Sequence, residues 1–432
     1  MKKKYQVLAG LAVIVAVALW LAGCDHYVCT SGATFGGSCT ASGSGLGTTG
    51  PGGSATAAFI FAVDTTGGTS GTATNGTIDG FTLNTTTNSL APTANYTAPT
   101  VPLGDPGVGM VVAQGKYLYA AFQSTRQIFG WTISSTGTLT SVSNNTPYSA
   151  AFLASASTVV GQQTMITNPA GTLLFIAVPG SSEIVVYSIG GGGALTLAST
   201  MPTPGFAPLN LTTDGLGKYL YATEGNSVSH TPNTGIAEFS INSTNGTLTS
   251  IGTLATPMWQ VAGEPTGKFL IGTTGESQLV NGTTDDDHLY VFSIASAGTP
   301  GALTELSPST STGTDSPFTI AVQPNANGNL VYSFGIADAQ FGGFNPIEGF
   351  SINSSGTLTG LQGSPFAIQQ GYWGQFDQTG AFLLEYGATV NVSTGIVTTQ
   401  INAMSVGSGG TLNVISPLTL VTQGYWAVTD AP

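Results

Sequence analysis

The residues of this chain that could perform acid–base chemistry are few. Glu224 and His230 lie six positions apart, and Arg126 is the only arginine in the sequence. A carboxylate and an imidazole can move protons to and from a substrate, and a guanidinium can polarise a carbonyl group. We therefore predict Glu224, His230 and Arg126 as catalytic candidates. The alternative is that they only solvate loops, because the sequence has few other charges.

Aromatic residues suggest a binding surface. We predict ligand binding by Trp259, Trp373 and Trp426, because aromatic faces suit a sugar or another partly apolar ligand. Packing between neighbouring structural units would also explain these tryptophans. Glu276 is a further binding candidate, in the same polar stretch as the acidic run 285–287. That run could attract calcium, but no spaced oxygen ligands follow it, so we predict neither a metal site nor a cofactor.

A short phrase of a small turn followed by Leu recurs at intervals of 49 to 56 residues. Its copies are Asn88-Ser89-Leu90, Gly137-Thr138-Leu139, Gly193-Ala194-Leu195, Gly246-Thr247-Leu248, Gly301-Ala302-Leu303, Gly356-Thr357-Leu358 and Gly410-Thr411-Leu412. Each repeat holds four short runs rich in β-branched and aromatic residues, which we name A to D and interpret as antiparallel strands. Seven such units predict an all-β, seven-bladed β-propeller.

The two ends of the repeat array indicate how the ring closes. The first unit begins with its second strand, at 57–63, and lacks a first one. The last apolar run, 424–429, has no unit of its own and resembles the start of the seventh unit, Gly371-Tyr372-Trp373. We therefore predict that the C-terminal strand completes the first blade.

The N-terminus has the features of an export signal. Three lysines precede an apolar run at 7–19, and Leu21-Ala22-Gly23-Cys24 resembles the bacterial lipobox. We predict a signal peptide at 1–23, lipidation of Cys24, a tether at 24–55 and the propeller at 56–432. An ordinary signal peptide with an incidental cysteine is the alternative. Cys29 and Cys39 form either a disulfide within the tether or two free thiols.

Charge limits the possible partners. The sequence has seven basic and twenty acidic residues, and removing 1–23 takes away three lysines, which leaves 4 − 20 = −16. So acidic a chain does not bind a phosphate backbone, which excludes nucleic acid as a partner. We expect an exported monomer, periplasmic or at the cell surface, that meets the membrane only through its lipid.

Loop lengths distinguish the two faces of the predicted ring. The turns between strands A and B are short and carry Lys116, Lys218 and Lys268. We expect long, irregular connections between strands B and C, at 64–76, 224–234, 274–287, 336–345 and 387–394. Long loops on a rigid scaffold commonly carry function, so we place the site on this face, where Glu385 also falls.

The repeated phrases Gly-Lys-Tyr-Leu-Tyr, Phe-Ser-Ile and Gly-Thr-Leu-Thr resemble the seven-bladed β-propeller lactonase family, which includes 6-phosphogluconolactonase-like proteins and carboxymuconate cycloisomerases. The resemblance covers the propeller and implies hydrolysis or closure of a lactone ring, in a family whose active members use His, Glu and Arg at the channel. A phosphorylated lactone would need several cations, so we expect a sugar-derived or other weakly charged lactone. A non-catalytic propeller that binds a glycan or a protein is the alternative.

Overall fold

The computed structural model describes residues 57–64, 75–84, 87, 89–105, 107–144, 146–157, 163–226, 231–275, 288–312, 317–324, 329–335, 347–366, 373–391, 396–420 and 426–430. The predicted leader, Cys24, Cys29 and Cys39 lie outside these residues, as do His230, Glu276 and the acidic run 285–287. No helix within the described residues is long and apolar enough to cross a membrane.

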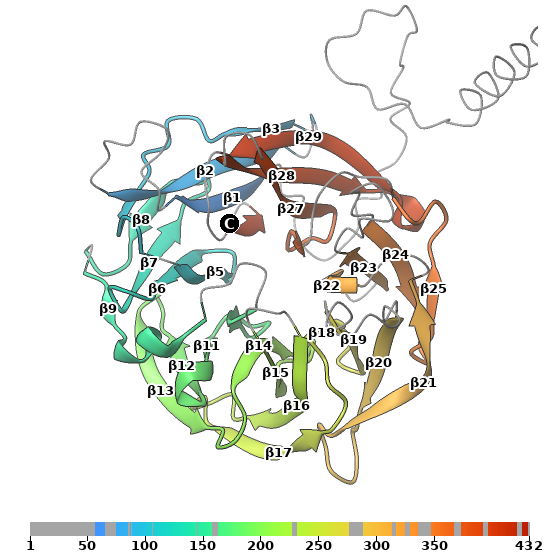
Figure 1. Cartoon of the computed structure of the whole chain (residues 1–432). Helices are drawn as coiled ribbons and strands as arrows, with labels where there is room; N and C mark the ends of the chain where they lie inside the picture. The colour runs from blue at the N-terminus through green and yellow to red at the C-terminus, as the bar shows by residue number, and fades with distance from the viewer. Residues whose placement is uncertain are drawn as a thin grey trace, which may run out of the picture. The chain divides into compact units, whose positions relative to one another are not determined.

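Seven antiparallel sheets follow one another around a ring (Figure 1). The first blade has the order β30 (Trp426–Asp430), β1 (Ala57–Asp64), β2 (Gly76–Asn84) and β3 (Ser89–Pro92), with β4 (Thr100–Val101) also beside β2. The second blade contains β5 (Gly107–Ala113), β6 (Tyr117–Phe122), β7 (Gln127–Ile133) and β8 (Leu139–Ser141), with β9 (Tyr148–Ser149) beside β7. The third contains β10 (Met165–Thr167), β11 (Leu173–Val178), β12 (Glu183–Ile189) and β13 (Leu195–Pro202).

The remaining four blades repeat the same order from the channel outward. The fourth contains β14 (Pro208–Thr213), β15 (Tyr219–Asn226), β16 (Thr231–Ile241) and β17 (Leu248–Leu254), and the fifth β18 (Gln260–Gly263), β19 (Phe269–Thr273), β20 (His288–Ile294) and β21 (Leu303–Ser311). The sixth contains β22 (Pro317–Val322), β23 (Leu330–Gly335), β24 (Ile347–Ile352) and β25 (Leu358–Gly360), and the seventh β26 (Trp373–Phe376), β27 (Phe382–Asn391), β28 (Ile396–Val406) and β29 (Leu412–Leu420).

These sheets confirm the predicted all-β, seven-bladed propeller with four main strands per blade. The predicted ring closure is also confirmed, because β30 pairs with β1 in the register Phe59↔Thr429 and Ala62↔Trp426. The described residues contain no α-helix, only short 3-10 turns such as Ala151–Ser155.

Burial on both faces explains why the inner strands are apolar throughout. Along β11, Leu174 and Ile176 pack toward the second blade, whereas Leu173 and Phe175 pack toward the fourth. Successive side chains of a strand point to opposite faces, so a sheet between two others needs apolar residues at every position.

The recurring glycine is a joint between blades. Gly301 has a φ of 91°, and a Cβ atom there would lie 2.4 Å from Cδ1 of Tyr219 in the preceding blade. Gly137 is similar, with a φ of 78° and Phe59 at 2.5 Å. Both the backbone conformation and the close approach therefore require glycine.

Tyrosine hydroxyls reinforce this joint in alternate blades. The hydroxyl groups of Tyr119, Tyr221 and Tyr332 donate to the carbonyl oxygens of Gly193, Gly301 and Gly410, at 2.7, 2.9 and 2.7 Å. Each bond links one blade to the next. The tyrosine of a strand-B run in one blade thus meets the glycine of the turn–Leu phrase in the next blade.

Two of the expected long loops are wrong in their bounds. Strands β27 and β28 continue as a hairpin to Asn391↔Ile396, so most of 387–394 is strand, as the β-branched residues on both sides favour. In the fourth blade, β15 runs through Glu224 to Asn226, which pairs with Thr231. The inner parts of the other expected loops, 65–74, 276–287 and 336–346, lie outside the described residues.

Candidate functional site

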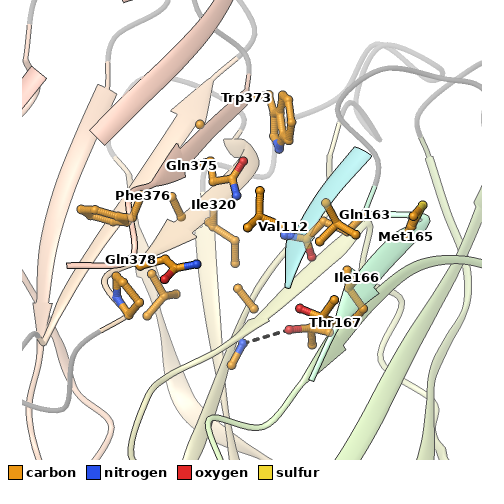
Figure 2. Close-up of a pocket in the computed structure, with 18 of the residues that line it drawn as sticks. Val112, Gln163, Met165, Ile166, Thr167, Ile320, Trp373, Gln375, Phe376 and Gln378 are labelled. Atoms are coloured by element: carbon orange, nitrogen blue, oxygen red, sulfur yellow. Dashed lines mark hydrogen bonds between the residues drawn. The ribbon is translucent and has the colours of Figure 1, made fainter. Parts of the chain in front are cut away.

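The innermost strands surround a cavity of about 370 Å³. Its lining comes from six blades and includes Val112, Gln163, Thr167, Ile320, Trp373 and Gln375 (Figure 2). A second cavity of about 490 Å³ shares Val112, Thr212 and Gln378 with the first. The two cavities are therefore parts of one channel.

The channel has two chemically distinct ends. We call the end at the A–B turns, such as 114–116 and 214–218, the turn end, and the opposite end, where β10 and β26 begin, the loop end. The second cavity lies at the turn end, where Asn168, Pro169 and Asp214 line it. Trp373 lies at the loop end of the first cavity (Figure 2).

The lining of the first cavity carries almost no charge. Among its described lining residues only Asp377 is ionisable, and its carboxylate accepts hydrogen bonds from the Phe382 amide, at 2.8 Å, and from the Thr379 hydroxyl. The lysines Lys116, Lys218 and Lys268 are exposed on the A–B turns and line neither cavity. A ligand in the first cavity therefore meets amides, hydroxyls, an indole and aliphatic groups.

Trp373 and Gln375 are the first and third residues of β26. Both side chains are half-buried and line the cavity. They are two residues apart on one strand, so they lie on the same face of it. Trp373 packs against the apolar cluster that includes Phe382 and Leu384, which supports the indole from behind.

Gln163 lies immediately before β10 and is held by its main chain. Its amide nitrogen donates to Oδ1 of Asn210 at 2.8 Å, and its carbonyl oxygen accepts from Leu211 at 2.9 Å. The side-chain oxygen Oε1 of Gln163 is buried and has no hydrogen-bond partner within the described part of the chain. Leaving a buried polar atom unpaired is unfavourable, so this oxygen is suited to accept a hydrogen bond from a water or a ligand.

Asn210 belongs to a layer of polar side chains that ties neighbouring blades together. Its side-chain nitrogen donates to the Trp259 carbonyl oxygen at 2.7 Å, and the Thr223 hydroxyl donates to the same oxygen at 2.7 Å. In the next blade, Oε1 of Gln260 accepts from the Ile320 amide at 2.8 Å. These bonds fix the innermost strands relative to one another.

The three predicted tryptophans have different environments. Trp259 is 1% exposed and stacks on Phe318, with ring centroids 5.7 Å apart, as expected if it packs between blades. It lines neither of these two cavities, and it packs with Phe318 between blades five and six. Trp373 lines the cavity, and Trp426 is described only through the backbone of β30.

Glu224 lies at the loop end of β15, where it is 7% exposed. Its Oε1 accepts a hydrogen bond from the Ala207 amide at 2.9 Å, and its Oε2 accepts one from the Thr234 hydroxyl. The carboxylate thus connects the segment before β14 to the middle of β16. His230, its predicted partner, is outside the described residues.

Arg126 is exposed on the turn between β6 and β7, with a φ of 55°. The buried Asp105 holds this turn, because its two oxygens accept hydrogen bonds from the Ser124 and Thr125 amides, each at 2.6 Å. Within the described residues Arg126 and Glu224 form no ion pair, and they belong to different blades.

Glu385 is the most unusual carboxyl group in the described structure. It is fully buried in β27, opposite the cavity-lining Gly374, and Oε2 accepts from the Asn402 side-chain nitrogen at 3.0 Å. Within the described residues, Oε1 of Glu385 has no partner. Burial raises the pKa of Glu385 to about 8, and the bond from Asn402 offsets this only in part. The side chain is therefore largely a neutral acid at pH 7.

The sequence singled out Glu385 as a polar residue of this end but missed Gln163, Gln375 and Asn210. Their amides carry no charge, and threonine-, asparagine- and glutamine-rich segments occur throughout the chain. The one usable signal was the position of Gln375, two residues after Trp373 in a predicted innermost strand.

Comparison with known families agrees with this architecture. A family model described as "Lactonase, 7-bladed beta-propeller" matches residues 75–262. A 6-phosphogluconolactonase from Xenorhabdus nematophila is 31% identical over 106 residues, which are 24% of this chain and 28% of that protein. The match therefore spans less than a third of the relative's length.

Solved structures share the fold at low sequence identity. A protein from Lactobacillus plantarum has a TM-score of 0.59 at 16% identity, covering 86% of this chain and 98% of that one. A periplasmic gluconolactonase from Pseudomonas aeruginosa has 0.56 at 12%, covering 86% and 100%. A putative 6-phosphogluconolactonase from Bacteroides uniformis has 0.55 at 17%, covering 84% and 99%.

Proposed function

We propose that this chain is a lactonase-family propeller that hydrolyses an uncharged or weakly charged, sugar-derived lactone at the loop end of its channel. The family match and the resemblance to 6-phosphogluconolactonases support the reaction class. The observation that carries the substrate class is the lining of the first cavity, whose described residues include no lysine, arginine or histidine.

A phosphorylated lactone fits this lining poorly. Phosphate groups are bound in proteins by lysine, arginine or several converging amides of the main chain. The only ionisable group that the described part of the chain places in the lining is the carboxylate of Asp377, and the described lysines are on the exposed turns. The neutral lining instead suits the hydroxyl groups of an uncharged ring.

In the proposed reaction, water attacks the lactone carbonyl, and the ring C–O bond breaks to give a hydroxy acid. Glu224 and His230 are the proposed acid–base residues, which take the proton from water and return it to the leaving ring oxygen. Arg126 is the proposed group that polarises the carbonyl. The hydrogen bonds from Ala207 and Thr234 hold the Glu224 carboxylate in one place at this end.

We further propose that the protein acts in the cell envelope. The leader 1–23 and the lipobox-like Leu21-Ala22-Gly23-Cys24 support export and a lipid anchor on Cys24, with the tether 24–55 joining the anchor to the propeller. The protein would then be a monomer in the periplasm or on the cell surface.

Turnover by the full-length protein tests the proposal. The protein is incubated with a panel of aldonolactones and aryl lactones, and acid release is followed with a pH indicator. We expect release well above the buffer rate that is lost in His230→Ala and Glu224→Gln. Glu305→Gln is a matched control, because Glu305 is an exposed carboxylate on the outer strand β21, and it should retain turnover.

A non-catalytic propeller that binds a glycan or a protein partner is the second candidate. The engagement of both Glu224 oxygens and the separation of Glu224 from Arg126 among the described residues favour it. A flat response across the lactone panel, from protein shown to be folded, would decide for this candidate.

A further inference from the structure

We infer that Trp373, Gln375 and Gln163 form a subsite at the loop end of the channel that binds one face of an uncharged, polyhydroxylated ring. This inference deepens the proposed function and rests on it only for the identity of the ring as a lactone. None of these residues belongs to the proposed acid–base set of Glu224, His230 and Arg126.

Trp373 provides the apolar surface of the subsite. It is half-buried, lines the cavity and lies at its loop end, as Figure 2 shows. The C–H groups of a sugar-like ring form an apolar face that stacks on an indole. Trp259, by contrast, has its ring covered by Phe318 and is only 1% exposed, so it has no surface left for a ligand.

Gln375 and Gln163 provide the polar groups. Gln375 lies on the same face of β26 as Trp373, further into the cavity, and a primary amide both donates to and accepts from a hydroxyl. Gln163 enters from β10, with Oε1 buried and unpaired within the described residues. A hydroxyl group of the ligand that donates to this oxygen would remove the cost of leaving a buried acceptor without a hydrogen bond.

The backbone around these groups is held in place before any ligand binds. The Gln163 main chain is fixed by two hydrogen bonds to the fourth blade, and Trp373 is backed by an apolar cluster. A site that needs little rearrangement loses little affinity to ordering. The cavity of about 370 Å³ also lies at the lower end of the size range of small-molecule sites, which suits a single ring.

The described lining residues carry no cation, which makes the subsite selective for neutral rings. An anionic substituent on the ring would lose hydration without gaining a positive partner in the first cavity. The subsite should therefore bind a neutral ring more tightly than the same ring with a phosphate group.

Binding is measured on the full-length protein, without turnover, by calorimetry and tryptophan fluorescence. The probes are D-glucono-1,5-lactam, methyl glucosides, neutral pentose and hexose sugars, and glucose 6-phosphate. We expect saturable binding of at least one neutral probe, with a dissociation constant at least tenfold lower than that for glucose 6-phosphate.

The variants locate the ligand. Trp373→Ala should weaken binding by about tenfold, whereas Trp373→Phe should retain most of it, since the effect depends on an aromatic face. Gln375→Ala and Gln163→Ala should each weaken binding severalfold. Gln362→Ala is the matched control, because Gln362 is an exposed glutamine that lines neither cavity, and it should leave binding unchanged. Gln378→Ala tests instead for binding toward the turn end of the channel.

Three results of the binding measurements overturn the inference. They are no binding of any neutral probe at millimolar concentration, tighter binding of the phosphorylated sugar, and binding that depends on Gln378 rather than on Trp373. Neutral-ring binding without lactone turnover would support the subsite and contradict the proposed hydrolysis. Turnover unaffected by the Trp373 and Gln375 substitutions would support hydrolysis and contradict the subsite.

Discussion

Two buried carboxyl groups, one at each end of the channel, are hydrogen-bonded to very different extents. At the turn end, Oε1 of Glu264 accepts hydrogen bonds from the Lys268 and Phe269 amides, at 2.6 and 3.1 Å, and Oε2 accepts one from the Thr266 amide at 2.7 Å. At the loop end, Glu385 is equally buried, yet Oε1 has no partner within the described residues. Glu264 thus closes a turn with both of its oxygens, whereas Glu385 has one oxygen without a partner in the described part of the chain.

This comparison distinguishes polar residues that stabilise turns of the scaffold from polar residues that are suited to a site. The residue that follows the innermost strand is Asn168, Asp214, Glu264 or Asp377 in four blades, and each caps its own A–B turn. Unpaired polar atoms of Gln163, Gln260 and Glu385 occur instead toward the loop end, in the described part of the chain. Natural proteins tolerate such atoms where a ligand or a chemical step uses them.

The largest expected effect comes from the glycine joint on the side of the turn end. Gly301→Ala places a Cβ atom 2.4 Å from Tyr219 at a φ of 91°, so we expect a loss of about 3 kcal/mol of unfolding free energy. Gly298→Ala is the control, because its φ is 76° but nothing lies within 4 Å, and it should lose only about 1 kcal/mol. Equal losses in chemical denaturation would show that close packing does not fix this joint.

Removing a turn-end carboxylate should also be strongly destabilising. In Glu264→Gln, an amide nitrogen replaces one oxygen and cannot accept the hydrogen bonds that oxygen received. We expect a loss of about 2 kcal/mol, measured by urea denaturation. A stability equal to that of Glu305→Gln would contradict the assignment of Glu264 to turn closure.

Substituting Glu385, the carboxyl group at the loop end, should increase the unfolding free energy instead of lowering it. Burial raises the folded-state pKa of Glu385 from 4.5 to about 8. The contribution of this side chain to the unfolding free energy is therefore fully present below about pH 4.5, where the acid is neutral in both states. It is lost as the pH rises toward 8, because the folded protein must then bury a carboxylate. Glu385→Gln should therefore stabilise the protein at pH 8 by about 2 kcal/mol and flatten the pH dependence between these limits. Denaturation from pH 4 to 9 checks this, and destabilisation by Glu385→Gln at pH 8 would contradict it.

A smaller effect is expected for the hydroxyl bridge between blades. Tyr221→Phe removes the bond from the Tyr221 hydroxyl to the Gly301 carbonyl oxygen and keeps the ring in place. We expect a loss of about 1 kcal/mol in the same denaturation assay. No loss would indicate that ring packing alone forms the joint.

The fold was predictable because the repeat is periodic and because the recurring glycines are required by their positive φ and by close contacts between blades. The strand that closes the ring was visible in the sequence as an unmatched apolar run, and β30 pairs with β1 as predicted. The bounds of β27 and β28 were harder, because a Thr- and Val-rich segment fits either a loop or a long hairpin. Propensity alone does not distinguish these two.

The site was less predictable, because its polar groups are uncharged and distant in sequence. Gln163 and Gln375 are brought to one cavity only by the ring. Nothing local marks Gln163, and only its position two residues after Trp373 marks Gln375. Trp259 and Trp373 occupy similar positions at the starts of innermost strands, yet Phe318 covers only the first. That difference depends on the residue contributed by the next blade.

The central claim is that the loop end acts on an uncharged ring. Its most direct test compares kcat/KM of the full-length protein for D-glucono-1,5-lactone and for its 6-phosphate, each corrected for spontaneous hydrolysis. Because the described lining of the first cavity has no cation, the account predicts turnover of the neutral lactone with a preference of at least tenfold. Preference for the phosphorylated lactone, or turnover of neither by folded protein, would contradict the account.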